Sequence, residues 1–289
     1  TDSVYGPTRH FCDTILQRNG IEVEYYDPRI GGGIGALMKP NTSAVFTESP
    51  GSVTFEVQDI PAIAAAAHAR GARVLMDNTW ASPLFFKPFE HGVDVSIQSI
   101  TKYLCGHSDL LMGSITSNEA VWKATLQGHG ALGACAAPDD VYLALRGLRT
   151  LSVRLERHMR TGLALARWLE GRPEVERVVH PALESHPDHA LWKRDFTGAS
   201  GLFGIVLKPC SDEALAAMLD GLELFGMGYS WGGFESLIVP QDLTGIRTAA
   251  PVAPQGPLLR IHAGLEDPGD LIADLEAGFA RLNAACPRR

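Results

Sequence analysis

Short strand-like segments alternate with a helix-forming segment in the first part of the chain, and this alternation constrains the fold most. Residues 44–48 and 74–77 are two such strand-like segments. Between them, residues 59–70 are rich in alanine, and Gly71 follows directly. This pattern predicts a helix capped by Asp59 and ended at the glycine. Strands alternating with helices indicate an α/β fold whose parallel sheet has right-handed crossovers.

A lysine follows the next strand-like segment, residues 93–97. Lys102 is preceded by hydroxyl side chains at Ser99 and Thr101, and Asp77 ends the preceding strand. In a parallel sheet both strand ends would open into one crevice, where such sheets bind ligands. An amine for a Schiff base, a carboxylate for a pyridinium nitrogen and hydroxyls for a phosphate together indicate a pyridoxal phosphate site.

The size and composition of the chain suit an ordinary globular enzyme. With 289 residues, 45% of them hydrophobic, the chain is long enough for two domains. A helical region at about 138–170 contains the expected domain change, near residues 146–149, and the second half reads as a smaller α+β domain. The predicted domains are therefore 1–148 and 149–289. A net charge of −8 without a basic stripe argues against a nucleic-acid surface.

The cellular setting follows from cysteines and hydropathy. The five cysteines are scattered and lack metal-site spacing, so neither a disulfide scaffold nor a zinc site is favoured. No apolar run is long enough for a bilayer, and no secretory signal opens the chain. We therefore expect a soluble cytoplasmic protein without membrane partners. The cysteines are Cys12, Cys105, Cys135, Cys210 and Cys286.

Several motifs resemble the Cys/Met-metabolism family of pyridoxal phosphate enzymes. They are MDNTW at 76–80, SIQSITKYLCGHSDLLMG at 96–113, YSWGGFESLI at 229–238 and LLRIHAGLEDPGDLIADLEAGFARL at 258–282. The resemblance runs through nearly the whole chain and implies a fold type I enzyme. This fold has a large cofactor domain with a mainly parallel sheet and a smaller C-terminal domain. Relatives begin roughly a hundred residues earlier, so we expect an N-terminal part to be absent from this sequence.

The resemblance implies roles for the residues at the strand ends. Lys102 would carry the cofactor and act as general base, and Asp77 would pair with the ring nitrogen. Ser99 and Thr101 would bind the phosphate, and Tyr5 would stack on the ring and help to move protons. The alternatives are a surface lysine, a solvated turn aspartate, ordinary strand hydroxyls and a tyrosine that is only packed.

The second half supplies the substrate-binding candidates. Arg260 resembles the arginine that grips the substrate α-carboxylate, a task that suits its bidentate fork. An internal ion pair is the competing explanation for a charge within a strand-like segment. Ser230 and Trp231, together with Tyr229, resemble groups around that carboxylate, whereas the alternative is a hairpin whose tryptophan is only core.

The activity implied by the resemblance is carbon–sulfur bond cleavage. We expect α,β-elimination of L-cystathionine to homocysteine, pyruvate and ammonia, in methionine biosynthesis, by a homotetramer. Other family activities are alternatives: cystathionine γ-synthase, cystathionine γ-lyase and methionine γ-lyase. An inactive, truncated scaffold or binding protein is a further alternative. A dinucleotide site at Gly31–Gly35 is disfavoured because Met38 stands where a third glycine is required.

Three histidines raise the question of a metal site. His180, His186 and His189 lie near Asp188, but Pro181 and Pro187 break any helical spacing. We therefore expect a solvated loop and no metal.

Overall fold

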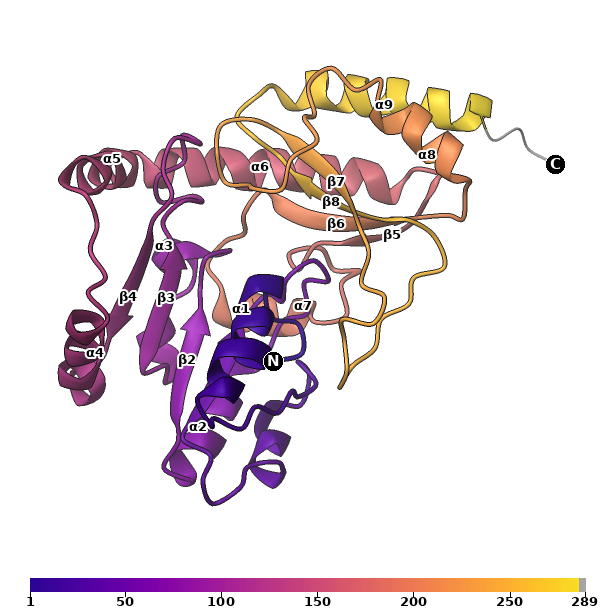
Figure 1. The fold of residues 1–289 in the computed structure, drawn as a ribbon. Coiled ribbons are helices and arrows are strands. Elements are labelled where there is room, and N and C mark those ends of the chain that lie inside the picture. Colours follow the sequence, from indigo (N-terminus) through magenta and orange to yellow (C-terminus); the bar gives the residue numbers. More distant parts are fainter. Residues whose placement is uncertain (286–289) are drawn as a thin grey trace.

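The computed structural model of the protein describes residues 1–285, so Cys286 lies outside the described residues. The described part contains two four-stranded sheets, and the long helix α6 (Leu151–Glu170) extends from the first to the second (Figure 1). Within residues 1–285, no helix has the length and apolarity needed to cross a membrane. Cys12, Cys105 and Cys135 form no disulfide.

The first sheet has three parallel strands and one antiparallel strand. Its order is β1 (Ala44–Glu48), β2 (Arg73–Asp77), β3 (Val95–Ser99) and β4 (Gly113–Ser117). Strands β1, β2 and β3 run parallel, whereas β4 is antiparallel to β3. The carboxyl ends of the three parallel strands therefore lie at one edge, where a ligand crevice is expected.

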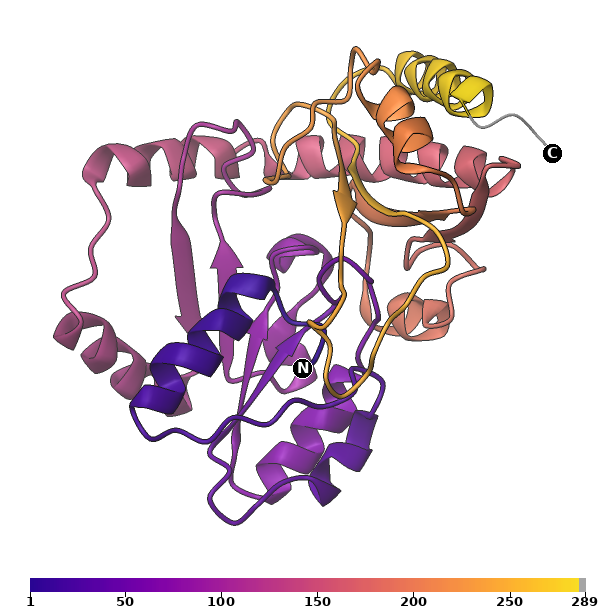
Figure 2. The same ribbon diagram turned by 45° about the vertical axis from the view of Figure 1, so that its right-hand side comes forward.

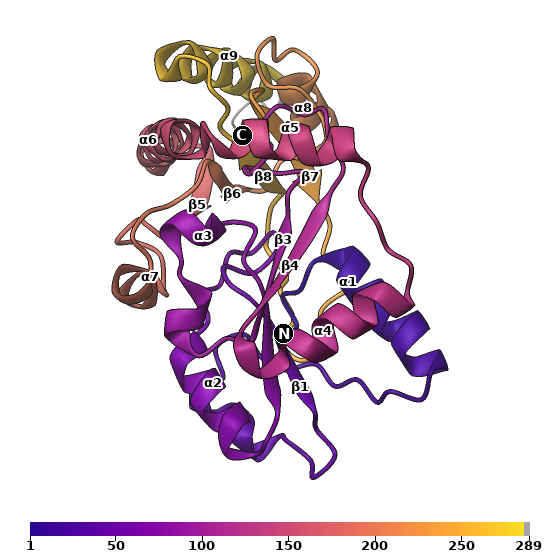
Figure 3. The ribbon, with the colours of Figure 1, turned by 90° about the vertical axis from the view of Figure 1, so that its left-hand side faces the viewer.

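Helix α2 (Ile60–Ala69) connects β1 to β2. Its start is fixed by Asp59, whose carboxylate accepts the Ala62 N–H at 3.2 Å. Its buried residues, Ile60, Ile63, Ala64 and Ala67, follow the spacing of one helical face. Figure 3 shows the first sheet with α2 on one side and α1 (Gly6–Phe11) on the other.

The second sheet is antiparallel throughout. Its order is β5 (Val175–Val179), β6 (Leu202–Leu207), β8 (Leu258–His262) and β7 (Leu237–Gln241). Its apolar residues pack with α6, α8 (Asp212–Leu219) and α9 (Pro268–Ala285). The mostly apolar sequence of β6 is explained because all six of its residues are buried.

The connection between β7 and β8 reaches back to the N-terminal segment (Figure 2). There the Asp2 carboxylate accepts the N–H groups of Thr248, Ala249 and Ala250 at 2.8–3.1 Å. In the same connection, Arg247 forms a buried ion pair with Glu56 at 3.4 Å. These contacts join the β7–β8 connection to the N-terminal part of the chain.

The remaining helices complete the described structure. They are η1 (Cys12–Leu16), η2 (Gly31–Ala36), α3 (Ser82–Phe85), η3 (Pro88–His91), α4 (Glu119–Ala131), α5 (Pro138–Leu148) and α7 (His189–Asp195). The glycine-rich segment that begins at Gly31 is thus a 3-10 helix.

Some sequence predictions were wrong. The sequence of residues 21–26 favours a strand, but in the structure these residues have no strand partner; Tyr26 is buried, and its hydroxyl bonds to Gln58 at 3.1 Å. All six residues line a cavity instead of pairing in a sheet. The helical region predicted at 138–170 is interrupted at Arg149 and Thr150, between α5 and α6.

Candidate functional site

The parallel strands β1, β2 and β3 place polar side chains on one face of the first sheet. Glu48 and Asp77 are partners in the register of β1 and β2, and Asp77 faces Ile97 on β3. Ser99 follows Ile97 by two residues, so alternation puts it on the same face. The sheet therefore brings Glu48, Asp77 and Ser99 together where the strands end.

Asp77 is a carboxylate enclosed by protein. Its Oδ1 accepts the Thr79 N–H at 2.9 Å, and the Thr79 hydroxyl also stabilises its charge. Although some of its surface stays accessible, burial raises the pKa of Asp77 above its ordinary value. Within residues 1–285 no ion pair joins it to a cation. A cationic group bound next to Asp77 would therefore stabilise its carboxylate.

Lys102 lies in the turn that follows β3. Its main-chain N–H bonds to the Ser99 carbonyl at 3.1 Å, and its Nζ donates to the Ser230 hydroxyl at 2.8 Å. Nζ also lies 5.3 Å from the centre of the Trp231 ring. Burial, followed by the charge of Arg260, lowers the pKa of Lys102 to about 8, and the charge of Asp77 opposes this shift. An appreciable share of this amine is therefore neutral near pH 7–8.

Arg260 is held in the middle of β8 without an acidic partner among the described residues. Its hydrogen bonds run from Nη2 to the carbonyls of Gly228, Tyr229 and Ser230. It is 9% exposed, and burial lowers its pKa. The ion-pair explanation for this charge is therefore not supported within residues 1–285. A buried guanidinium that meets only carbonyls retains its charge for an anionic ligand.

Two tyrosines flank Arg260. Tyr5 is 48% exposed, and its N–H donates to Glu48 Oε2 at 2.8 Å. Tyr229 is more exposed and contributes its carbonyl, not its ring, to the contact with Arg260. Both tyrosines raise the pKa of Arg260 electrostatically, against the larger effect of burial. The 228–236 loop therefore contacts this arginine through the Tyr229 carbonyl, whereas the influence of Tyr5 is electrostatic.

The two predicted phosphate hydroxyls differ in their surroundings. Thr101 Oγ1 accepts the Met112 N–H at 3.0 Å and donates to the Met112 carbonyl at 3.3 Å. It therefore ties the lysine turn to the segment before β4, and its one proton is already in use. Ser99 is half-buried and bonds through its main-chain N–H to the Thr79 hydroxyl at 2.9 Å.

Sequence reasoning missed two residues of the site. Thr79 links Asp77 to Ser99 through its hydroxyl. Glu48 ends β1 just as Asp77 ends β2, and burial together with Asp77 raises its pKa well above the ordinary range. Aligning the ends of the two predicted strands could have identified Glu48. Thr79 could have been noticed as the hydroxyl two residues after a strand-ending aspartate.

The histidine segment does not form the solvated loop that was expected. His180 and His186 are 0% and 3% exposed, and each Nδ1 accepts a main-chain N–H at 3.1 Å. Asp188 instead bonds to Arg29 through two contacts of 2.8 Å. Within residues 1–285 no group of three acidic, histidine or cysteine side chains could hold a metal. His180 and His186 therefore each stabilise the main chain of this segment through Nδ1.

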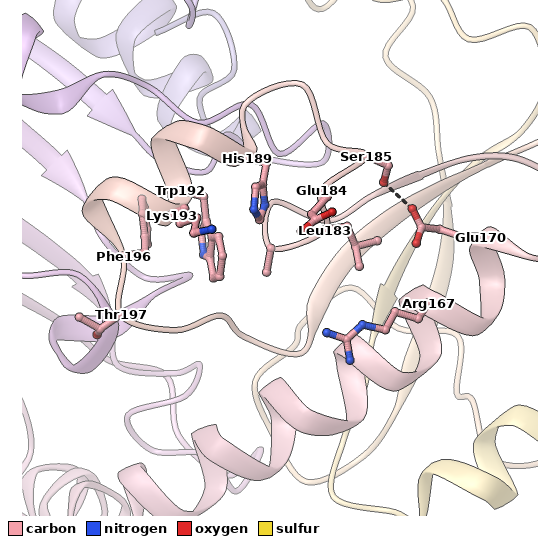
Figure 4. Close-up of a pocket in the computed structure, with 11 residues that line it drawn as sticks. Arg167, Glu170, Leu183, Glu184, Ser185, His189, Trp192, Lys193, Phe196 and Thr197 are labelled. Atoms are coloured by element: carbon pink, nitrogen blue, oxygen red, sulfur yellow. Dashed lines mark hydrogen bonds between the residues drawn. The ribbon is translucent and has the colours of Figure 1, made fainter.

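A pocket of about 640 Å³ lies next to this segment (Figure 4). Arg167 and Glu170 project toward it from α6, opposite His189 and Trp192 of α7, and Glu170 bonds to Ser185. None of Lys102, Asp77 and Arg260 lines it. This pocket is separate from the strand-end site.

The strand-end side chains fit pyridoxal phosphate. The aldehyde requires an amine with a lowered pKa, which Lys102 supplies, and a pyridinium requires a carboxylate such as Asp77. Lys102 lowers the pKa of Asp77 and Asp77 raises that of Lys102, as expected of opposite charges near each other. Lys102 therefore suits the aldehyde of the cofactor, and Asp77 suits its ring nitrogen.

Known proteins resemble the chain over almost its whole length. Residues 1–280 match the model of the Cys/Met metabolism PLP-dependent enzyme family. A putative cystathionine beta-lyase of Rhizobium johnstonii is 57% identical over 98% of this chain and 72% of the relative. The cystathionine beta-lyase MetC of Escherichia coli is 47% identical over 98% of this chain and 73% of the relative. An L-alanine/L-glutamate racemase of Wolbachia pipientis is 44% identical over 97% of this chain and 70% of the relative.

The family match and the geometry agree. The matched region includes both the strand ends of the first sheet and the arginine strand of the second. The expected resemblance and the expected cofactor are thereby confirmed. This chain belongs to the Cys/Met metabolism family of PLP-dependent enzymes, which has the fold type I architecture.

Proposed function

We propose that this chain is a carbon–sulfur lyase that cleaves L-cystathionine, with water, to homocysteine, pyruvate and ammonia. The observation that carries the proposal is the Lys102 amine, which donates to Ser230 in the loop bound by Arg260 and follows the strand next to that of Asp77. An amine between a ring partner and a carboxylate partner is what α,β-elimination from an amino acid requires. The two cystathionine beta-lyase relatives support this substrate.

The chemistry that pyridoxal phosphate supplies when bound is an aldehyde for the amino group and a ring that withdraws electrons from Cα. Lys102 would hold the aldehyde until the substrate amine replaces it. The freed amine would then take the Cα proton, a task suited to a pKa of about 8. Ser230, 2.8 Å from Nζ, would accept a hydrogen bond from the amine and restrict its position.

The remaining residues would bind and orient the substrate and the cofactor ring. Arg260 would turn its guanidinium from the loop carbonyls to the α-carboxylate, beside Ser230 and Trp231. Asp77 would keep a proton on the ring nitrogen. When the cysteine half of cystathionine is held in this way, sulfur lies on Cβ, so loss of the Cα proton would break the bond between Cβ and sulfur, and the thiolate would leave as homocysteine.

The phosphate and stacking roles are also proposals. Ser99 offers a hydroxyl on the face that carries Asp77, whereas Thr101 would first have to release the Met112 carbonyl. Tyr5 would stack on the ring, held by the bond from its N–H to Glu48.

We also propose a domain division and an assembly. Residues 1–148 would form the large cofactor domain and residues 149–289 the smaller C-terminal domain, in line with the two separate sheets. A cytoplasmic homotetramer is implied by the family. Exposed apolar side chains on α4 and α5 would suit its interfaces; they include Trp122, Leu126, Tyr142 and Leu145.

Product analysis tests the activity. The purified protein with added pyridoxal phosphate should release pyruvate and homocysteine from L-cystathionine, whereas a γ-lyase would release 2-oxobutyrate. Lys102→Ala should abolish pyruvate release, while Lys123→Ala, which removes an exposed amine on α4, should not. Continued turnover by the Lys102→Ala protein would refute the assignment.

A second candidate is amino-acid racemisation, which the Wolbachia relative favours. A substrate such as alanine has no leaving group on Cβ and cannot eliminate, so return of a proton to the opposite face of Cα would give the other enantiomer. Incubation with L-alanine followed by chiral analysis tests this reaction. Formation of D-alanine would support it, and its absence would exclude it for this substrate.

A further inference from the structure

The loop of residues 228–236 rests directly on the main chain of Lys102. Gly232 in this loop has a φ of +84°, and a Cβ added there would lie 2.8 Å from Tyr103 N and 3.0 Å from Lys102 Cα. A contact this close leaves no room for a side chain. Any shift of Gly232 therefore changes the position of its neighbours, Ser230 and Trp231, relative to the lysine.

One imidazole fixes this part of the loop. His262 Nε2 accepts the Gly232 N–H at 3.0 Å, and His262 Nδ1 lies 3.0 Å from the Glu235 carbonyl, to which it must donate. The ring is thus neutral, with its proton on Nδ1. His262 is 1% exposed, and burial lowers its pKa well below 6.5, which is consistent with this neutral form.

His262 works together with Arg260, two residues earlier on the same face of β8. Arg260 binds the carbonyls of Tyr229 and Ser230, and His262 binds Gly232 and Glu235. Side chains of strand β8 therefore form hydrogen bonds to the loop on both sides of Trp231. The outer end of the loop is anchored separately, by two contacts of 2.7–2.8 Å from the Ser108 hydroxyl to the Glu235 carboxylate.

We propose that His262 is a positioning residue that fixes Ser230 and Trp231 against the Lys102 amine. It touches neither the amine nor the proposed ligand positions, and it acts through the main chain of Gly232 and Glu235. The inference rests on the proposed function in one respect, because it takes Lys102 as the reacting amine. The geometry of the loop is independent of which substrate is used.

The test compares replacements that remove one or both hydrogen bonds. His262→Leu removes both, whereas His262→Gln can place an amide oxygen near Nε2 and keep the bond from Gly232. His158→Leu is the matched control. His158 is also fully buried, its ring centre lies 5.1 Å from that of His262, and its hydrogen bond goes to the Ala263 carbonyl rather than to the loop.

The first readout is hydrogen exchange of the 228–236 peptide in the cofactor-free protein. Loss of two buried hydrogen bonds should speed exchange by about 10-fold or more in His262→Leu. His262→Gln should fall between this variant and the wild type, and His158→Leu should match the wild type. An unchanged rate in His262→Leu would overturn the proposal.

The second readout separates positioning from general destabilisation. His262→Leu should raise KM for cystathionine by about 10-fold or more while its kcat falls less, because the loop no longer presents the substrate side of the site. His158→Leu should leave KM unchanged even if its melting temperature falls. Faster loop exchange with an unchanged KM would refute the positioning role. Wild-type protein without pyruvate release would refute the proposed function instead, and the exchange experiment would still decide what His262 does.

Discussion

Replacing Asp77 by asparagine should change the cofactor-free and cofactor-bound proteins in opposite directions. In the absence of cofactor, Asp77 is an enclosed carboxylate beside Glu48, and burial raises the pKa of both groups. Asparagine removes one of these charges and keeps an oxygen for the Thr79 N–H. The melting temperature of the cofactor-free protein should therefore rise, by roughly 2–4 °C if the relief is about 1 kcal/mol.

The bound form should lose affinity. A charge-assisted hydrogen bond contributes about 1.5–3 kcal/mol and a neutral one about 0.5–1.5 kcal/mol. Replacing the charge-assisted hydrogen bond to the ring nitrogen with a neutral one should therefore weaken cofactor binding by roughly 5- to 30-fold. Glu48→Gln is the matched control, because it relieves the same repulsion and keeps an acceptor for the Tyr5 N–H. It should stabilise the cofactor-free protein with a smaller loss of affinity.

The pH dependence gives the sign of the stability effect. A carboxyl group whose folded pKa is raised binds more protons when folded than when unfolded. Stability of the cofactor-free wild type should therefore fall as pH rises from 3.8 through the raised pKa of Asp77. The advantage of Asp77→Asn should be present above that range and vanish below it. Thermal scans across pH and titration with pyridoxal phosphate measure both effects; a destabilised variant, or one with unchanged cofactor affinity, would refute the reasoning.

Three further predictions concern other residues of the site. Arg260→Lys keeps the charge but loses the fork, so KM should rise by about 10-fold or more; a KM equal to that of the wild type would remove Arg260 from the substrate site. Capture of pyridoxal phosphate by the cofactor-free protein should accelerate as pH rises toward about 8, where Lys102 loses its proton, and then level off; a rate independent of pH between 6 and 9 would contradict the lowered pKa. Thr79→Val removes the hydroxyl between Asp77 and Ser99 and should weaken cofactor binding severalfold in an equilibrium titration; unchanged affinity would show that this hydroxyl serves folding alone.

The sequence predicted the first sheet well because local signals agreed there. The strand at 44–48 was predicted with the bounds that the structure has, and the strand at 74–77 was predicted with one residue missing at its start. The helix before β2 began at its predicted cap, Asp59. The strand prediction for residues 21–26 was wrong because a strand needs a partner, and side-chain alternation does not reveal one.

The site was predictable at the level of residue types but not of contacts. Lys102 and Asp77 stood at adjacent strand ends, so a parallel sheet was bound to bring them together. The hydrogen bond from Lys102 to Ser230 joins residues 128 positions apart, and no local pattern encodes it. The same is true of His262, whose partners, Gly232 and Glu235, are known only once β8 faces the loop.

Borohydride reduction of the cofactor-loaded protein, followed by peptide mass spectrometry, tests the assignment of the lysine most directly. Reduction makes the bond between the lysine nitrogen and the cofactor permanent, so the modified residue can be read from the fragment masses. We predict a phosphopyridoxyl group on Lys102, and its loss in Lys102→Ala. A modified lysine elsewhere in the chain, with Lys102 unmodified, would contradict the account.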